Sequence, residues 1–120
     1  FYLLAAEGLA KQGNETRAKE LYKQLLTLRY PEATAAADVA YVDALTGTAL
    51  LDDIYLNTRI ELWGEGTSFF DWKRWKTGIN RYEAGSNHLL KVEVPAESEK
   101  WTYQIPKAEM ESNPNMIQNE

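Results

Sequence analysis

The sequence predicts a mainly α-helical fold, in which helical hairpins are followed by an irregular C-terminal segment packed across the helices. Three observations predict it. Apolar residues recur at helical spacing through residues 1–78, and glycine, asparagine and proline interrupt this pattern at intervals. Residues 79–120 lose the periodicity but keep their aromatic side chains. The chain has 120 residues, which suits one domain, and 44% of them are hydrophobic, enough for a core.

Residues 1–30 are expected to form a helical hairpin. The first helix has an apolar face of Tyr2, Ala5, Ala6 and Leu9. Gly13 ends this helix, and Asn14 can cap the next one by accepting a backbone N–H. The second helix has an apolar stripe of Ala18, Leu21, Tyr22, Leu25 and Leu28. Tyr30-Pro31 ends it, because the residue before a proline avoids the helical region.

This hairpin is tetratricopeptide-like. Ala18 and Tyr22 match the A-x₃-F element of that repeat, and Pro31 lies near its proline. The match is partial, since Tyr2 and Ala6 stand where the pattern has Trp and Gly. Any antiparallel helix pair is the alternative. One such unit cannot bury both of its faces, so we expect neighbouring helix pairs before it in a longer protein.

Residues 31–78 are expected to be mostly helical. A short helix fits the Ala-rich stretch 35–45, and the strongest helical pattern covers 50–63. Its apolar face consists of Leu51, Ile54, Tyr55, Thr58 and Leu62. Glycines at 64 and 66 end it. A last short helix is predicted over 69–76, capped by Thr67 or Ser68 and ended by Gly78.

Residues 79–120 are expected to form an extended tail. Gly85-Ser86-Asn87 predicts a turn, and the alternation at 92–94 predicts a short strand. Residues 101–106 also alternate, but the proline at 106 limits them to an edge or extended strand. One helical turn is expected at 107–111. A free loop of this length is unusual, so the tail is expected to pack on the helices.

Composition excludes several kinds of site. The net charge of −5, with no basic stripe, argues against nucleic-acid binding. The absence of cysteine excludes thiolate catalysis, zinc–thiolate sites and disulfides in this segment. His88 is the only histidine and has no second histidine to share a metal, so we predict no metal and no cofactor. No apolar run approaches the roughly 20 residues needed to span a bilayer.

Three carboxylates offer one catalytic hypothesis. Glu61 and Glu65 lie four residues apart, which would place them on one helix face, and Asp71 follows. Paired carboxylates serve glycoside hydrolysis. Basic residues are interleaved with these acids: Arg59, Lys73 and Arg74. This interleaving favours a structural ion-pair network over catalysis by these three acids.

An aromatic cluster offers a binding hypothesis. Its members are Trp63, Phe69, Phe70, Trp72 and Trp75. Helical spacing favours core packing for most of them, but aromatic faces also stack on sugar rings. The indole N–H groups of Trp72 and Trp75 need partners if both rings are buried. These two residues are therefore the candidates for ligand contact.

Three motifs in this order resemble the C-terminal region of the SusD/RagB family. The first is YLLAAEGLA at 2–10, similar to a family Tyr-Leu-x-x-Ala-Glu-Ala-x-Ala. The second, and most specific, is RIELWGEG at 59–66 with FFDWKRW at 69–75. The third is IPKAEMESNP at 105–114. Two features depart from the common pattern: Ser68 stands where many members have Arg, and a single Arg59 replaces a double Arg.

The resemblance implies a non-catalytic, surface-exposed lipoprotein of the outer membrane in Bacteroidetes-type bacteria. Such a protein binds a nutrient, mostly an oligosaccharide, and passes it to a TonB-dependent SusC-like transporter. It also implies that residues 1–120 are the C-terminal portion of one SusD-like helical domain, with the lipid anchor and most ligand-binding loops upstream. A structural role is implied for the motif residues Arg59, Glu61, Glu65, Gly66, Asp71, Arg74, Trp75, Pro106, Asn113 and Pro114.

Overall fold

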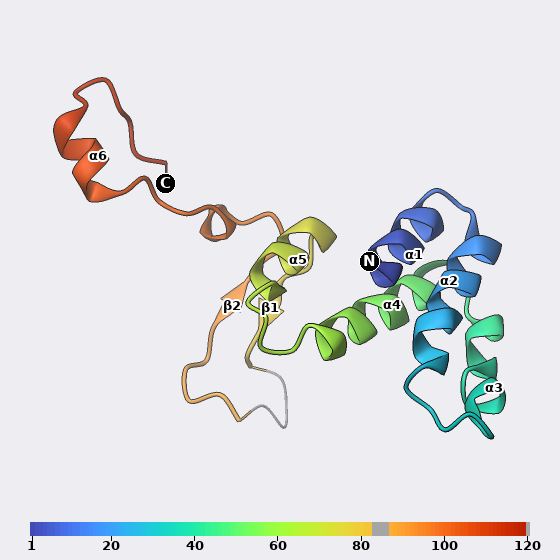
Figure 1. Cartoon of the computed structure of the whole chain (residues 1–120). Helices are drawn as coiled ribbons and strands as arrows, with labels where there is room; N and C mark the ends of the chain where they lie inside the picture. The colour runs from blue at the N-terminus through green and yellow to red at the C-terminus, as the bar shows by residue number, and fades with distance from the viewer. Residues whose placement is uncertain (83–86, 120) are drawn as a thin grey trace. The chain divides into compact units, whose positions relative to one another are not determined.

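The computed structural model describes residues 1–82 and 87–119 (Figure 1). The helices are α1 (Tyr2–Lys11), α2 (Glu15–Thr27), α3 (Ala35–Asp38), α4 (Gly47–Glu61), α5 (Ser68–Trp75) and α6 (Lys107–Ser112). Two 3₁₀ turns, η1 (Ala40–Ala44) and η2 (Glu99–Trp101), and two strands, β1 (Ile79–Asn80) and β2 (Glu93–Val94), complete the elements. The predicted mainly α fold with helical hairpins is confirmed. The chain divides into two compact units, Phe1–Gly64 and Glu65–Glu120.

The first unit begins with the predicted hairpin of α1 and α2, which pack against each other. Gly13 forms the turn with φ of +80°, a conformation that glycine adopts without steric cost. The side chain of Asn14 accepts a hydrogen bond from the backbone N–H of Arg17 at 3.4 Å. Both predicted boundary signals are therefore confirmed.

The apolar faces of the hairpin differ in detail from the prediction. On α1 the buried residues are Leu3, Ala6 and Glu7, whereas Tyr2 is 43% exposed. The buried face of α1 is therefore rotated about the helix axis relative to the predicted face. On α2 Ala18 and Tyr22 are buried as predicted, together with Leu26. Leu28 is 80% exposed, because this C-cap residue keeps a helical backbone but lies off the face formed by Ala18, Tyr22 and Leu26.

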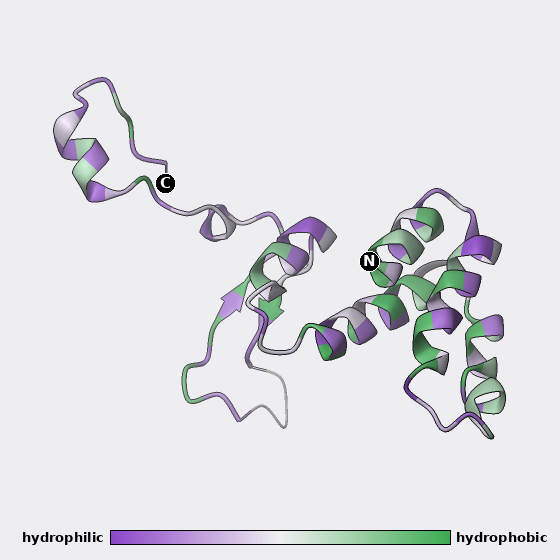
Figure 2. Cartoon of the chain, viewed as in Figure 1, coloured by the Kyte–Doolittle hydropathy of each residue, from purple (hydrophilic) through white to green (hydrophobic). Residues whose placement is uncertain are grey.

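A single apolar core holds the first unit together. In Figure 2 the long helices α1, α2 and α4 each carry both hydrophobic and hydrophilic residues, as amphipathic helices do. The buried core residues are Leu3, Ala6, Ala18, Tyr22, Leu26, Val39, Val42, Leu50 and Ile54. They come from α1, α2, α4 and the segment between α2 and α4, so burial joins these elements into one unit.

A polar network around Tyr22 ties α2 to η1 and α4. The Tyr22 hydroxyl donates to Asp53 Oδ2 at 2.6 Å, and the Tyr41 hydroxyl donates to the same oxygen at 3.0 Å. The side-chain amide of Asn57 in turn donates to the Tyr22 hydroxyl. Burial, together with the Asp53 carboxylate, raises the pKa of Tyr22, and burial is also the largest cause that raises the pKa of Tyr41.

The boundaries of α4 correct one prediction about the carboxylates. Its inner face is built from Leu50, Ile54 and Thr58, four residues apart. The helix ends at Glu61, and glycine at 64 has φ of +82°, which helical backbone does not allow. Glu65 therefore lies outside α4, and the prediction that it shares a helix face with Glu61 is wrong. The predicted short helix at 35–45 is divided into α3 and η1.

The second unit is built around α5 and a two-stranded ladder. Helix α5 ends at Trp75, because Lys76 adopts a left-handed conformation. Neither Thr67 nor Ser68 is seen to cap it through a side-chain hydrogen bond among the described residues. Strands β1 and β2 pair antiparallel, with Ile79 opposite Val94. The strand at 92–94 was predicted, but its partner β1 was not.

Gly78 is required where the chain enters this ladder. A Cβ added at Gly78 would lie 2.8 Å from the carbonyl oxygen of Val94 and 3.0 Å from the backbone nitrogen of Ala96. Both contacts are with backbone atoms, which cannot move aside as a flexible side chain could. The glycine thus allows β2 to approach closely, a role beyond the predicted helix end.

The tail contains α6 as predicted, and residues 101–106, predicted as an edge or extended strand, join no β-ladder within the described part of the chain. Trp101 belongs to η2, and the extended residues after it bond instead to side-chain amides near the chain end. Gln118 both accepts from the backbone N–H of Ile105 at 2.9 Å and donates to its carbonyl at 3.0 Å. These amides supply the partners that a neighbouring strand would otherwise give. The turn predicted at Gly85-Ser86-Asn87 starts outside the described residues.

Candidate functional site

Helix α5 presents an aromatic cluster to the tail of the second unit. The Phe69 ring stacks on Tyr103 with centroids 4.9 Å apart, and lies 5.5 Å from the ring of Trp101. It also meets Phe70 edge-on at 5.5 Å. Such ring pairs contribute about 0.5–1.5 kcal/mol each beyond the area that they bury. The irregular tail therefore packs on α5 through aromatic contacts.

Trp101 forms the floor of this cluster. Its side chain is 4% exposed, and its indole N–H donates to the carbonyl of Pro95 at 2.9 Å. Trp101 was not predicted to be a site residue. Its local pattern indicated an edge strand, and its aromatic partner on α5 lies about thirty residues away, beyond the reach of periodicity. No local signal would have found it.

A pocket of about 290 Å³ lies beside this floor. Its lining comes from the end of α5 and from the segment around η2. The lining residues are Trp72, Lys73, Lys76, Glu97, Ser98, Trp101 and Thr102. Of the two predicted candidates for ligand contact, the structure places Trp72 in this pocket.

An ion pair crosses the lining of this pocket. Lys76 Nζ lies 2.7 Å from Glu97 Oε1, and the two residues have φ of 54° and 61°. Among the described residues these are the only non-glycine residues with positive φ. Such a conformation costs roughly 1–3 kcal/mol for a residue with a side chain and is concentrated at functional sites. The pair joins the end of α5 to the η2 segment.

The lining combines the groups that polyhydroxylated ligands need. Trp72 offers an apolar aromatic surface, and Ser98 and Thr102 offer hydroxyls that both donate and accept. Two ammonium groups and one carboxylate add charged hydrogen-bonding partners. A few polar groups placed around an aromatic surface are typical of small-molecule sites.

The second predicted candidate, Trp75, is placed differently. It is half-buried and does not line the pocket. The guanidinium of Arg74 lies 5.5 Å from the centre of its ring, and Arg74 also pairs with Asp71 at 2.9 Å. These contacts fix Trp75 within a cation–π arrangement on α5.

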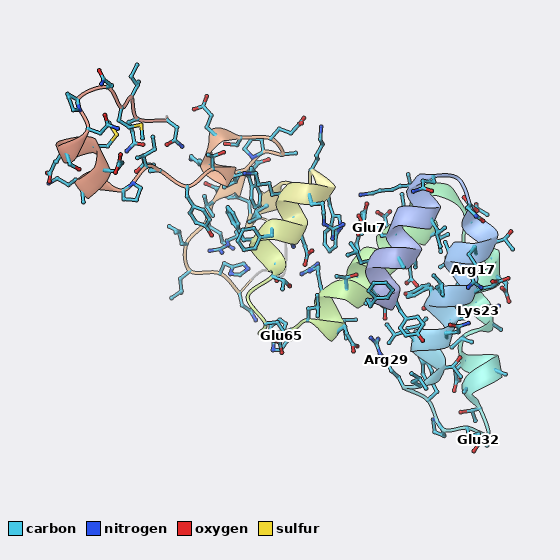
Figure 3. The ribbon with its side chains drawn as sticks, turned by 45° about the horizontal axis from the view of Figure 1, so that its top comes forward. Glu7, Arg17, Lys23, Arg29, Glu32 and Glu65 are labelled. Carbon is cyan, nitrogen blue, oxygen red and sulfur yellow. The ribbon has the colours of Figure 1, made fainter. Side chains whose placement is uncertain are left out.

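The remaining motif residues lie in both units. In the first, Arg59 is in the last turn of α4, and Glu61 pairs with Arg29, which is labelled in Figure 3. In the second, Pro106 precedes α6, and its carbonyl accepts from Glu109 and Met110. The motif residues Glu65 and Gly66 are the first two residues of the second unit, and Gly66 has φ of +76°.

Asn113 and Pro114 end α6. The Asn113 side chain accepts from the backbone N–H of Asn115 at 3.2 Å, which turns the chain after the helix. These local contacts explain why each residue type suits its place. The implied role of the motif residues, tying the last helices to the returning tail, stays a prediction.

Within the described ranges, no three His, Asp or Glu side chains gather closely enough to hold a metal ion. None of the helices in the described part of the chain is long and apolar enough to cross a membrane.

Comparison with known proteins identifies the family of this chain. No curated protein and no solved structure is significantly similar to this chain. The profile of the SusD family matches residues 1–120. The match covers all three sequence motifs, the first unit with its hairpin and the second unit with its aromatic pocket. The chain belongs to the SusD family.

Proposed function

We propose that this protein is a non-catalytic, surface-exposed nutrient-binding subunit of the outer membrane. It captures a glycan and passes it to a TonB-dependent transporter, and the present chain supplies scaffold together with one candidate contact at Trp72. The family match over residues 1–120 carries the proposal, since family membership supports a role in glycan-binding nutrient uptake in general.

The ion pairs and positions of the three candidate carboxylates support a binding role over hydrolysis. Glycosidases place two carboxyl groups on either side of the scissile bond, about 5–9.5 Å apart. Here Glu61 is engaged by Arg29, and Asp71 is engaged by Arg74. Glu65 is not on α4, so the helical spacing that motivated a catalytic pair is lost. These acids are suited to holding the fold.

The test of glycan capture is calorimetric titration of the full-length protein with neutral and acidic oligosaccharides. We expect binding of at least one class, and chromatography of the recovered sugars should show them uncleaved. Release of shorter sugars would contradict the non-catalytic role. Failure of every oligosaccharide to bind would contradict the glycan part of the proposal.

The transporter partnership needs a separate experiment. We expect a tagged full-length protein, solubilised from outer membranes in mild detergent, to co-purify with a TonB-dependent transporter identified by mass spectrometry. A tagged, unrelated surface lipoprotein from the same membranes is the control. Recovery of the tagged protein alone, in several detergents, would contradict the partnership.

A groove in the first unit favours a second function, that of a tetratricopeptide-like protein-interaction module. It has a volume of about 870 Å³ and is open to solvent. It is lined by residues of α2, of the loop between α2 and α3, and of α3 with its C-cap: Glu20, Lys23, Gln24, Thr27, Leu28, Tyr30, Glu32, Ala35, Ala36 and Val39. If this function holds, Leu28→Glu should abolish binding of a protein partner and leave glycan binding unchanged.

A further inference from the structure

We propose that the pocket beside Trp72 binds an acidic sugar unit, a hexuronate ring whose carboxylate is held by Lys73. This inference rests on the proposed function and deepens it, because it names the class of glycan and the residues that recognise it. The juxtaposition of an aromatic surface, two hydroxyls and an excess ammonium group carries it.

The charge of the pocket lining favours an acidic ligand. The lining holds two lysines and one glutamate, so it carries one more positive than negative charge, although the whole chain has a net charge of −5. Lys76 is paired with Glu97 at 2.7 Å, and the excess charge is therefore that of Lys73. An ammonium group is a compact point charge with three donors, which suits a carboxylate on a flexible glycan.

The size of the pocket and its aromatic wall favour a single sugar ring. About 290 Å³ is close to the lower end of the range for small-molecule pockets, so the space fits one sugar ring and not a long stretch of polymer. Trp72 provides an aromatic surface for the C–H face of the ring. Ser98 and Thr102 also line the pocket; the Ser98 hydroxyl accepts from the backbone N–H of Lys100 at 3.3 Å and keeps its own proton to donate to a ring hydroxyl.

Preorganisation of the pocket also favours binding. The floor is fixed by the buried Trp101 and its hydrogen bond to Pro95. The Lys76–Glu97 ion pair is exposed, with side chains 69% and 65% accessible, and adds little to this preorganisation. A site that is held before the ligand arrives loses less conformational freedom on binding.

The deciding probe pair is a trimer of galacturonate and its fully methyl-esterified form. The two differ in charge and share the same rings and linkages. We expect the full-length protein to bind the acid about tenfold more tightly than the ester, because a charge-assisted hydrogen bond is lost with esterification. The preference should shrink as salt is raised, since an exposed ion pair is screened.

Variants assign the preference to the pocket. Lys73→Gln should remove most of the difference between acid and ester. Lys100→Gln is the matched control, because it removes the same charge from η2 at a residue that does not line the pocket. Trp72→Ala should weaken both ligands, with far-ultraviolet circular dichroism and thermal melting to show that the fold is kept.

Glu97→Gln separates ligand recognition from a structural role. It releases Lys76 from its partner, so the pocket gains a second available ammonium group. We expect tighter binding of the acid, by about three- to tenfold, even if thermal stability falls slightly. If Lys76 and Glu97 only support the fold, the same variant would leave binding unchanged or weaken it.

These titrations test the pocket inference and glycan capture separately. Equal affinity for acid and ester, or an acid preference that survives Lys73→Gln, would overturn the pocket inference and leave glycan capture standing. Absence of binding by all oligosaccharides would overturn both. Acid preference that is lost in Lys73→Gln and kept in Lys100→Gln would establish the site.

Discussion

The two units of this chain are stabilised in different ways. Among the residues that the structure describes, the buried apolar side chains belong to Phe1–Gly64, with the single exception of Trp101. The first unit is an assembly of amphipathic helices around one core. The second has a ring cluster on α5, a two-residue ladder and a tail held by side-chain amides.

The difference separates scaffold from site. Buried helix–helix packing gives a rigid framework but offers few shaped polar surfaces. Irregular segments on such a framework provide most of the recognition in proteins, because their backbone and side chains face solvent. The pocket beside Trp72 lies in the second unit, where two residues have strained backbone. Substitutions that disrupt one unit and leave the other unchanged would test this separation.

The largest effect is expected from Trp101→Ala. The side chain is buried, carries a hydrogen bond and contacts Phe69, so its loss should destabilise the second unit by about 3–5 kcal/mol. Hydrogen exchange of the full-length protein should show lost protection in α5 and η2, with α1, α2 and α4 unchanged. Tyr103→Ala, which removes an exposed ring from the same cluster, should cost less. Equal loss in both units would contradict separate stabilisation.

Ile54→Ala is the corresponding change in the first unit. Ile54 is fully buried in the core, and truncation should cost about 2–5 kcal/mol through lost burial and the cavity left behind. The exposed Ile60 on the same helix is the matched control, and Ile60→Ala should change stability by well under half of that amount. Denaturant unfolding measures both. Similar losses for the two variants would show that the core is not where the structure places it.

Tyr22→Phe tests the polar network of the first unit. Removing the hydroxyl leaves the Asp53 carboxylate and the Asn57 amide short of a partner, at a cost of about 1–3 kcal/mol. The exposed Tyr82→Phe should be nearly neutral. In a double-mutant cycle with Asp53→Asn, the loss of stability in the double mutant should be smaller than the sum of the two single losses. Additive effects would indicate that the two groups do not interact.

The same network predicts a pH dependence. Because the pKa of folded Tyr22 is raised, the unfolded chain loses this proton first as pH increases. The contribution is fully present below the unfolded pKa of about 10, and stability falls as pH rises above it. In Tyr22→Phe this fall should be smaller. An unchanged alkaline slope in the variant would rule out Tyr22 as its source.

Gly78→Ala and Gly8→Ala form the last and smallest comparison. At Gly78 the added methyl group meets backbone atoms of the β2 segment and should destabilise the second unit by about 1–3 kcal/mol. At Gly8, inside α1, an added Cβ would meet no atom within 4 Å apart from its own helix backbone, and alanine should stabilise the first unit by about 0.5–1 kcal/mol. Thermal melting gives the sign of each change. The same sign for both would contradict the contacts described at Gly78.

The sequence was informative wherever local chemistry decides structure. Gly13 and Asn14 marked the first turn, and Pro106 and Asn113 bracketed α6. Exact faces were harder, because neighbouring elements select which residues of a helix are buried. Leu28 followed the apolar stripe of α2 in sequence but lies beyond its end.

Non-local contacts could not be predicted from one sequence. Two-residue strands such as β1 carry no periodicity, and their pairing with β2 joins segments more than ten residues apart. The role of Trp101 depends on its ring contact with Phe69 of α5, which is distant in sequence. Trp72 was selected for its chemistry and lies in the pocket, whereas Trp63, taken as part of the same cluster, lies in the first unit and is 86% exposed.

Hydrogen exchange of the full-length protein with and without the galacturonate trimer tests the separation of scaffold and site most directly. We predict increased protection at the end of α5 and around η2, including Trp72, Lys73 and Thr102, with the backbone of α1, α2 and α4 unchanged. Protection confined to the first unit, or to residues outside both segments, would contradict the assignment of ligand contact to the second unit.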